Sequence, residues 1–170
     1  QPEAWLSRRF SGYPYELFDS GTAALSAAVE YALRSKRPGR NRVLIPAYSC
    51  PALPAAIWAA GGEPTLVDFA PVRPWLDLAD LKSKIDDRTV AIVAVDLFGI
   101  SERHSALKQI AKDANIVLIQ DAAQRPPPDF SRDDTGDIVV FSFGRGKPGT
   151  ILTGGALIFC DSSLHRKEIG

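Results

Sequence analysis

Short apolar runs rich in β-branched residues alternate with helix-like segments along the chain, and this alternation limits the possible folds more than any other feature. It is the pattern of a parallel sheet that is covered by helices on both faces. We therefore predict an α/β fold with a mostly parallel, seven-stranded sheet. The predicted strands are residues 16–19, 43–46, 64–69, 90–96, 116–121, 138–143 and 156–159.

Helices are predicted between these strands. The clearest is 22–34, where apolar residues recur at helical spacing. It follows Ser20 and Gly21, which together with Thr22 form a turn suited to capping a helix. The other predicted helices are 51–60, 78–85, 105–114 and a last one, 164–169, that Ser162 and Ser163 precede. At 170 residues the chain is long enough to build one well-packed core.

Charge and composition narrow the choice of partners. Lys and Arg together number 20, as do Asp and Glu, so neither nucleic acid nor an anionic membrane is expected as the main partner. Proline, glycine or charge interrupts every apolar stretch, and the amino terminus lacks a signal-peptide pattern, so we expect a cytoplasmic location. Cys50 and Cys160 have no metal-binding spacing. A small soluble ligand is therefore the favoured partner, and no metal site is predicted.

Ligands of open α/β sheets bind beyond the carboxyl ends of the strands. The turn from Ser20 to Ala23 follows the first strand and offers glycine and free backbone N–H groups to a phosphate, although strand-turn-helix junctions of this composition are also common structural features. Asp121 ends a buried strand, and Gln124 follows three residues later. A carboxylate in that place needs a partner, which is either a protonated pyridine nitrogen or a structural ion pair or helix cap.

A third strand end carries a lysine. Ser142 lies near the end of the predicted strand 138–143, and Gly144 and Gly146 precede Lys147. Glycines leave room for a ligand close to the backbone, and partial burial of a lysine favours the neutral amine that reacts with an aldehyde; a solvated loop lysine is the alternative. Neither GxGxxG after the first strand nor GxxxxGK[ST] is present. Jointly, a phosphate turn, a strand-end carboxylate and a lysine fit one phosphate ester that bears an aldehyde.

Five stretches that cover most of the chain are similar to a known family. They are SGTAAL at 20–25, VLIPAYSCPALPAAIWAAGGEPTLVDF at 43–69, RTVAIVAVDLFG at 88–99, IVLIQDAAQ at 116–124 and FSFGRGKPGTILTGGALIF at 141–159. These stretches resemble the nucleotide-sugar (DegT/StrS) aminotransferases, which have fold type I and depend on pyridoxal 5′-phosphate (PLP). The resemblance implies that an amino group passes from a donor, typically glutamate, to PLP and then to a keto group of a nucleotide-linked sugar or related acceptor, in polysaccharide or natural-product biosynthesis.

The resemblance also implies a role for each candidate site residue. The catalytic residue is Lys147, which carries PLP as a Schiff base and moves a proton. Thr22 and Ala23 hold the phosphate together with Ser142, Asp121 pairs with the pyridine nitrogen, and Gln124 lies near the ring hydroxyl. The full set of cofactor-binding residues is Gly21, Thr22, Ala23, Cys50, Asp121, Gln124, Ser142 and Lys147.

The chain departs from the family pattern at four places. Cys50 stands where the family usually has an aromatic residue that stacks on the ring, and a thiol cannot supply that face. Thr153 replaces the glutamate of a common Glu-Gly-Gly, and Asp96 stands where a histidine is frequent. Arg125, followed by three prolines, replaces small residues. These departures indicate a divergent branch whose acceptor can differ from a standard nucleotide sugar.

The family is longer than this chain, so we expect residues 1–170 to be the PLP-binding large-domain core of a longer protein, without the C-terminal small domain, incomplete as a catalyst and homodimeric. A non-catalytic scaffold or partner-binding module that keeps the fold is the main alternative, and another PLP reaction, such as elimination or dehydration of a sugar, is a third. His104 and His165 fall in polar segments, so we expect both to be exposed and without a catalytic role.

Overall fold

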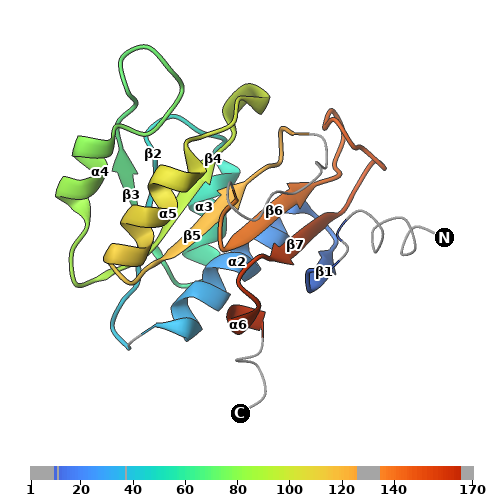
Figure 1. Cartoon of the computed structure of the whole chain (residues 1–170). Coiled ribbons are helices and arrows are strands. Elements are labelled where there is room, and N and C mark those ends of the chain that lie inside the picture. Colours follow the sequence, from blue (N-terminus) through green and yellow to red (C-terminus); the bar gives the residue numbers. More distant parts are fainter. Residues whose placement is uncertain (1–9, 11, 37, 126–134, 166–170) are drawn as a thin grey trace.

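The computed structural model describes residues 10, 12–36, 38–125 and 135–165, and it has one seven-stranded sheet (Figure 1). The order across the sheet is β1-β7-β6-β5-β4-β2-β3. The strands are β1 (Tyr15–Phe18), β2 (Arg42–Pro46), β3 (Glu63–Val67), β4 (Thr89–Val95), β5 (Val117–Asp121), β6 (Ile138–Ser142) and β7 (Gly155–Phe159). Each predicted strand is present, with bounds that differ from the prediction by at most two residues.

Strands β2 to β6 pair in parallel, whereas β7 is antiparallel to both β6 and β1. The predicted mostly parallel sheet is therefore confirmed. Strand β2 lies between β3 and β4, so the chain passes to the other side of β2 after β3. This reversal creates the topological switch point at which ligands of doubly wound sheets bind, and it lies at the carboxyl ends of β2 and β4.

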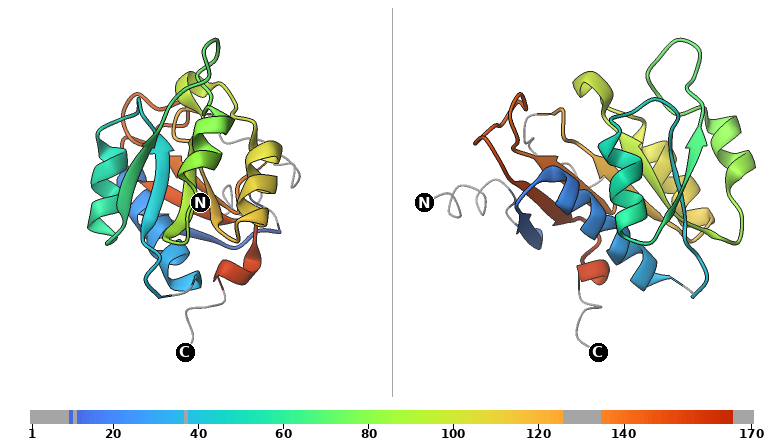
Figure 2. Two further views of the ribbon diagram at one scale, coloured as in Figure 1. Left: turned by 90° about the vertical axis from the view of Figure 1, so that its left-hand side faces the viewer. Right: turned by 180° about the vertical axis from the view of Figure 1, so that it is seen from behind.

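Helices cover both faces of the sheet (Figures 1 and 2). Helices α2 (Gly21–Ser35) and α3 (Ala52–Ala59) lie on one face, and α4 (Leu78–Lys84) and α5 (His104–Asp113) lie on the other. The short elements η1 (Leu97–Gly99) and α6 (Ser162–His165) complete the described structure. The first four helices begin and end within one residue of the predicted bounds. Of the last predicted helix, 164–169, residues 164 and 165 belong to α6, and 166–169 lie outside the described residues.

The alternation of side chains along β2 shows why both faces need cover. Val43 and Ile45 pack in the cluster that α2 and α3 complete, whereas Leu44 packs in the cluster that α4 and α5 complete. Strand β4 is buried on both faces from Thr89 to Ala94. Such continuous apolar strands are typical of the interior of a parallel sheet. No helix in the described part of the chain combines the length and the apolar character needed to cross a membrane.

Candidate active site at the carboxyl edge of the sheet

A cavity of about 200 Å³ opens at the carboxyl edge of the sheet, where the strand-end residues singled out in the sequence meet. Its walls come from the start of α2, the loop after β2, and the segments that follow β4, β5 and β6. The lining residues are Gly21, Thr22, Leu25, Ser49, Cys50, Ala52, Leu53, Val95, Leu97, Asp121, Ala123, Gln124, Ser142 and Lys147.

The start of α2 forms one end of the cavity. Ser20 caps the helix, because its Oγ accepts a hydrogen bond from the Ala23 backbone N–H at 3.1 Å. The first turn contains no acidic residue, so the positive end of the helix dipole is available to an anion. Ala23 is not a lining residue and its N–H donates to Ser20, whereas Gly21 and Thr22 do line the cavity.

Gly21 allows α2 to begin directly beside the end of β6. A Cβ atom at position 21 would lie 2.6 Å from Ser142 Cβ and 2.7 Å from Ser142 Oγ, both closer than real contacts allow. The missing side chain therefore brings the Ser142 hydroxyl against the first turn of the helix. A hydroxyl donor and helix-terminal N–H groups together suit the oxygens of a phosphate.

Asp121 is a partly buried carboxylate at the end of β5. Its Oδ1 accepts a hydrogen bond from the Ala123 backbone N–H at 3.0 Å. Burial raises the pKa of Asp121 and the nearby charge of Asp96 adds to this rise, whereas the Ala123 hydrogen bond and the charge of Lys147 oppose it. A further positive partner would favour the ionised form of this carboxyl group, and a protonated ring nitrogen would supply one.

Gln124 is held in a defined orientation. Its Oε1 accepts a hydrogen bond from the Phe98 backbone N–H at 2.7 Å. The amide nitrogen of Gln124 is therefore the group that remains for a ligand, and it can only donate. Gln124 lines the cavity, so it suits an acceptor such as a ring hydroxyl oxygen in its ionised form.

Lys147 reaches the same cavity from the loop between β6 and β7. Its backbone is part of a turned segment in which Lys147 N–H donates to Gly144 O at 3.2 Å and Thr150 N–H donates to Lys147 O at 3.1 Å. Gly146 has a φ of +76°, a conformation that favours glycine. The turn places Lys147 close enough to Asp121 for its charge to act on that carboxyl group.

The wall after β2 carries the predicted departure from the family pattern. Cys50 lines the cavity beside Ser49 and is exposed. The apolar lining residues Leu53, Val95 and Leu97 were not singled out from the sequence. Their apolar character resembles that of ordinary core positions, so only the packing of the strand ends identifies them as lining residues.

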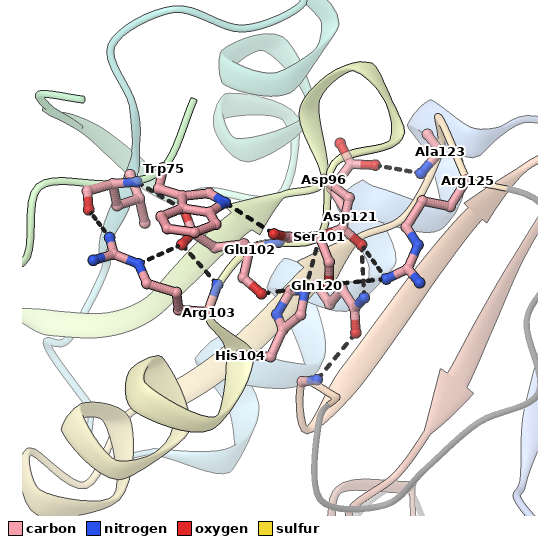
Figure 3. Close-up of polar contacts among 12 residues, drawn as sticks. Trp75, Asp96, Ser101, Glu102, Arg103, His104, Gln120, Asp121, Ala123 and Arg125 are labelled. Carbon is pink, nitrogen blue, oxygen red and sulfur yellow. Dashed lines mark hydrogen bonds and ion pairs between the residues drawn. The ribbon is translucent and has the colours of Figure 1, made fainter. Parts of the chain in front are cut away.

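A buried polar cluster lies next to the cavity and was missed in the sequence (Figure 3). Asp96 and His104 have no exposed surface, and His104 Nε2 lies 2.8 Å from Asp96 Oδ1. The prediction that His104 is exposed was therefore wrong: its helix α5 turns the ring toward the carboxyl ends of β4 and β5. His165 is partly exposed and packs against Phe159, with 4.8 Å between the ring centroids.

The groups in the cavity fit PLP as a set. The α2 end with Ser142 suits a phosphate, Asp121 suits a ring nitrogen cation, and Lys147 suits an aldehyde. The departure at Cys50 leaves one side of the site without an aromatic ring face. None of the described residues form a cluster of three His, Cys, Asp or Glu side chains that could hold a metal ion.

Comparison with known proteins agrees with this set of groups. Residues 16–169 match the profile of the DegT/DnrJ/EryC1/StrS aminotransferase family. The chain is 31% identical over 147 residues to a "Pleiotropic regulatory protein" of Geobacillus stearothermophilus, which covers 84% of this chain and 40% of that protein. It is 30% identical over 152 residues to the GDP-perosamine synthase of Caulobacter vibrioides, covering 88% of this chain and 40% of the synthase.

Solved structures give the same result. Spr1654 of Streptococcus pneumoniae in its PLP form superposes with a TM-score of 0.78 at 26% identity, covering 92% of this chain and 44% of that one. The chain thus spans about 40% of the length of these relatives. The match covers both the strand ends that line the cavity and the lysine loop. The chain therefore belongs to the DegT/DnrJ/EryC1/StrS family of PLP-dependent aminotransferases.

Proposed function

We propose that the protein to which this chain belongs is a PLP-dependent aminotransferase that transfers an amino group, with glutamate as the donor, to a keto group of a nucleotide-linked sugar or a related acceptor. Residues 1–170 would form its cofactor-binding large-domain core. The observation that carries the proposal is that Lys147, Asp121 and the start of α2 line one cavity. That combination suits an aldehyde, a ring nitrogen and a phosphate of one molecule.

Each residue has a separate task in this proposal. Gly21 and Thr22 bind the phosphate through the helix start, and Ser142 donates its hydroxyl. Asp121 keeps the ring nitrogen positively charged, and Gln124 donates to the ring hydroxyl oxygen. When bound, PLP would serve as an electron sink at the substrate carbon. Lys147 Nζ would hold the cofactor covalently and then move a proton between the substrate carbon and the cofactor carbon.

The names of relatives bear on the class of acceptor. Relatives of similar identity are named GDP-perosamine synthase, UDP-N-acetyl-3-dehydro-α-D-glucosamine 3-aminotransferase and 3-amino-5-hydroxybenzoate synthase. These names support a cyclic keto compound, most often a nucleotide-linked sugar, in polysaccharide or natural-product biosynthesis. The remaining partner that we propose is a second copy of the chain, since exposed apolar residues such as Tyr48 and Phe98 lie in segments that border the cavity.

The absorbance of PLP bound to the purified chain tests the cofactor site. We expect a band for a lysine adduct that becomes permanent on borohydride reduction, and mass mapping should locate the reduced label on Lys147. Lys147→Ala should remove both the band and the label. Lys82→Ala, which changes an exposed lysine of α4, should change neither. Unchanged labelling in the Lys147→Ala variant, or a label spread over surface lysines, would contradict the proposal.

A second function is a non-catalytic scaffold that keeps the fold. Two observations favour it: Cys50 lacks the ring face, and one relative is named a "Pleiotropic regulatory protein". A folded chain that forms no adduct at Lys147, both as it stands and within a longer protein, would support this second function. An adduct at Lys147 would support the enzyme.

A further inference from the structure

The buried polar cluster beside the cavity is built around the carboxylate of Asp96, at the end of β4 (Figure 3). Asp96 Oδ1 accepts from the Glu102 backbone N–H at 2.9 Å and from His104 Nε2 at 2.8 Å. Asp96 Oδ2 accepts from Gln120 Nε2 at 2.8 Å and from Arg125 Nη1 at 3.3 Å. Four donors therefore satisfy a carboxylate that has no exposed surface.

Three of these donors, His104, Glu102 and Gln120, favour the ionised form of Asp96. Burial opposes its ionisation, but the hydrogen bond and charge of His104, together with the Glu102 and Gln120 hydrogen bonds, outweigh burial and lower the pKa of Asp96. Removing one partner of a buried carboxylate is costly, because part of its charge is then uncompensated. A hydrogen bond to Asp96 therefore restrains the segment that donates it.

Arg125 connects the turn after β5 to Asp96. Its side chain is 27% exposed, and Nη1 donates both to Asp96 Oδ2 and to Ser101 Oγ, the second at 3.1 Å. Its backbone N–H donates to Ala122 O at 3.0 Å, which closes the turn after β5. The guanidinium thus ties this turn to the segment that follows β4, the segment to which Asp96 and Ser101 belong.

The turn that Arg125 closes carries Gln124 and contacts Asp121, two residues of the proposed cofactor site. Ala123 N–H donates to Asp121 Oδ1, and Gln124 Oε1 accepts from Phe98 N–H. The Gln124–Phe98 contact depends on the placement of the turn relative to η1, and the Ala123–Asp121 contact depends on the conformation of the turn itself. Arg125 itself does not line the cavity, so its effect on a ligand must pass through these neighbours.

We propose that Arg125 is a positioning residue of the cofactor site, which uses the buried Asp96 carboxylate to hold Asp121 and Gln124 in place. The part of this inference that concerns PLP rests on the proposed function. The positive charge of Arg125 also lies beside Asp96, whose negative charge acts on Asp121 at the neighbouring strand end.

Hydrogen exchange of the PLP-free chain tests the positioning role without any need for cofactor binding. In Arg125→Ala we expect protection of the Phe98 and Ala123 amides to fall by about tenfold, the effect of losing one charge-assisted hydrogen bond. Protection of Leu44, deep in β2, should stay unchanged. Arg125→Lys, which keeps the charge, should lose less protection than Arg125→Ala, and it provides the same test if the alanine variant does not fold.

The matched control is Arg103→Ala. Arg103 is a second guanidinium of the same cluster, but it donates to Glu102 and Leu76 and lies 5.0 Å from the Trp75 ring centroid. Its removal should leave the Phe98 and Ala123 amides as protected as before. Unchanged protection in the Arg125 variants, or an equal loss at Leu44, would overturn the inference.

The affinity for PLP completes the test. We expect Arg125→Ala to weaken PLP binding by about tenfold, because misplaced donors lose their contribution to the complex, whereas Arg103→Ala should not. Equal affinity in Arg125→Ala and the unchanged chain would overturn the role of Arg125 in the cofactor site. If the unchanged chain forms no Lys147 adduct, the proposed function fails, and the exchange result still decides whether Arg125 positions the turn.

Discussion

At the scale of single residues, Asp121 shows a conflict between stability and ligand binding. Its carboxyl group is partly buried, and burial together with the charge of Asp96 raises its pKa. Without a ligand, the ionised form is therefore less favourable in the folded chain than in the unfolded chain. Sites that pre-organise charge for a ligand often have this cost in stability.

We predict that Asp121→Asn makes the PLP-free chain more stable at neutral pH. An aspartate in an unfolded chain ionises near pH 4, and a raised pKa in the folded state means that stability falls as the pH rises through that region. The amide keeps an oxygen for the Ala123 N–H but carries no charge. The melting temperature should be higher at pH 7, and the difference should disappear below about pH 4.

The control for this prediction is Asp87→Asn, which removes a charge from an exposed position. It should change the melting temperature little at either pH, since exposed charges contribute weakly. Asp121→Asn should also bind PLP more weakly, because the amide cannot stabilise a ring nitrogen cation. A melting temperature at pH 7 below that of the unchanged chain would show that the carboxylate stabilises the fold.

Some of the functional residues could be identified from the sequence pattern alone, and others could not. Lys147, Asp121 and Ser142 were found because polar residues directly after apolar runs stand out in an α/β chain. The roles of His104 and Arg125 were not, since the partner that explains each, Asp96, is 8 or 29 positions away in the sequence. Burial of a polar side chain depends on such distant contacts, which local composition does not reveal.

At the scale of elements, the site depends on how closely α2 approaches β6. The two elements meet at Gly21 and Ser142, and α2 packs against the sheet through buried residues such as Ala24 and Ala28. Small residues on this face let the helix lie close to the strands. The first turn of the helix and the hydroxyl of Ser142 then reach the same part of the cavity.

We predict that Gly21→Ala destabilises the chain by about 1–3 kcal/mol, the usual cost of forcing extra atoms into a packed region. The new Cβ would lie 2.6 Å from Ser142 Cβ, so either α2 or the end of β6 must move. Thermal unfolding measures the loss of stability, and PLP titration should show weaker binding because the phosphate contacts separate.

Gly144→Ala provides a matched control at the other side of Ser142. A Cβ there would lie 3.6 Å from Ser142 Oγ, an ordinary contact distance. This variant should unfold within about 0.5 kcal/mol of the unchanged chain, as expected for a substitution without a clash. Equal destabilisation by both substitutions would mean that loop flexibility, and not the close approach of α2, explains the glycine at position 21.

At the scale of the whole molecule, exposed apolar side chains gather at the carboxyl edge of the sheet. Tyr48 follows β2, Phe98 follows β4, and Ile151 lies in the loop after β6, with exposed fractions of 65%, 69% and 68%. All three segments border the cavity. A concentration of exposed apolar residues at one edge is typical of an interaction surface.

We predict that the chain associates with itself through this edge as its concentration rises. A triple variant, Tyr48→Ser with Phe98→Asn and Ile151→Ser, should remain monomeric at concentrations at which the unchanged chain associates, as measured by light scattering. Asparagine suits the positive φ of Phe98. The control is Trp58→Ser, which changes an exposed residue near the end of α3. A monomeric unchanged chain at high concentration would contradict the prediction.

The sequence by itself determined the elements of this protein, their order and the strand ends that carry Lys147, Asp121 and Ser142, because side-chain periodicity and turn chemistry are local properties of the chain. Only the tertiary structure decided which strand ends are neighbours, how the Asp96 carboxylate gathers four donors, and that Arg125 ties one loop to another. The physical reason is that burial and hydrogen-bond satisfaction are set by residues distant in sequence, once the sheet has brought them together.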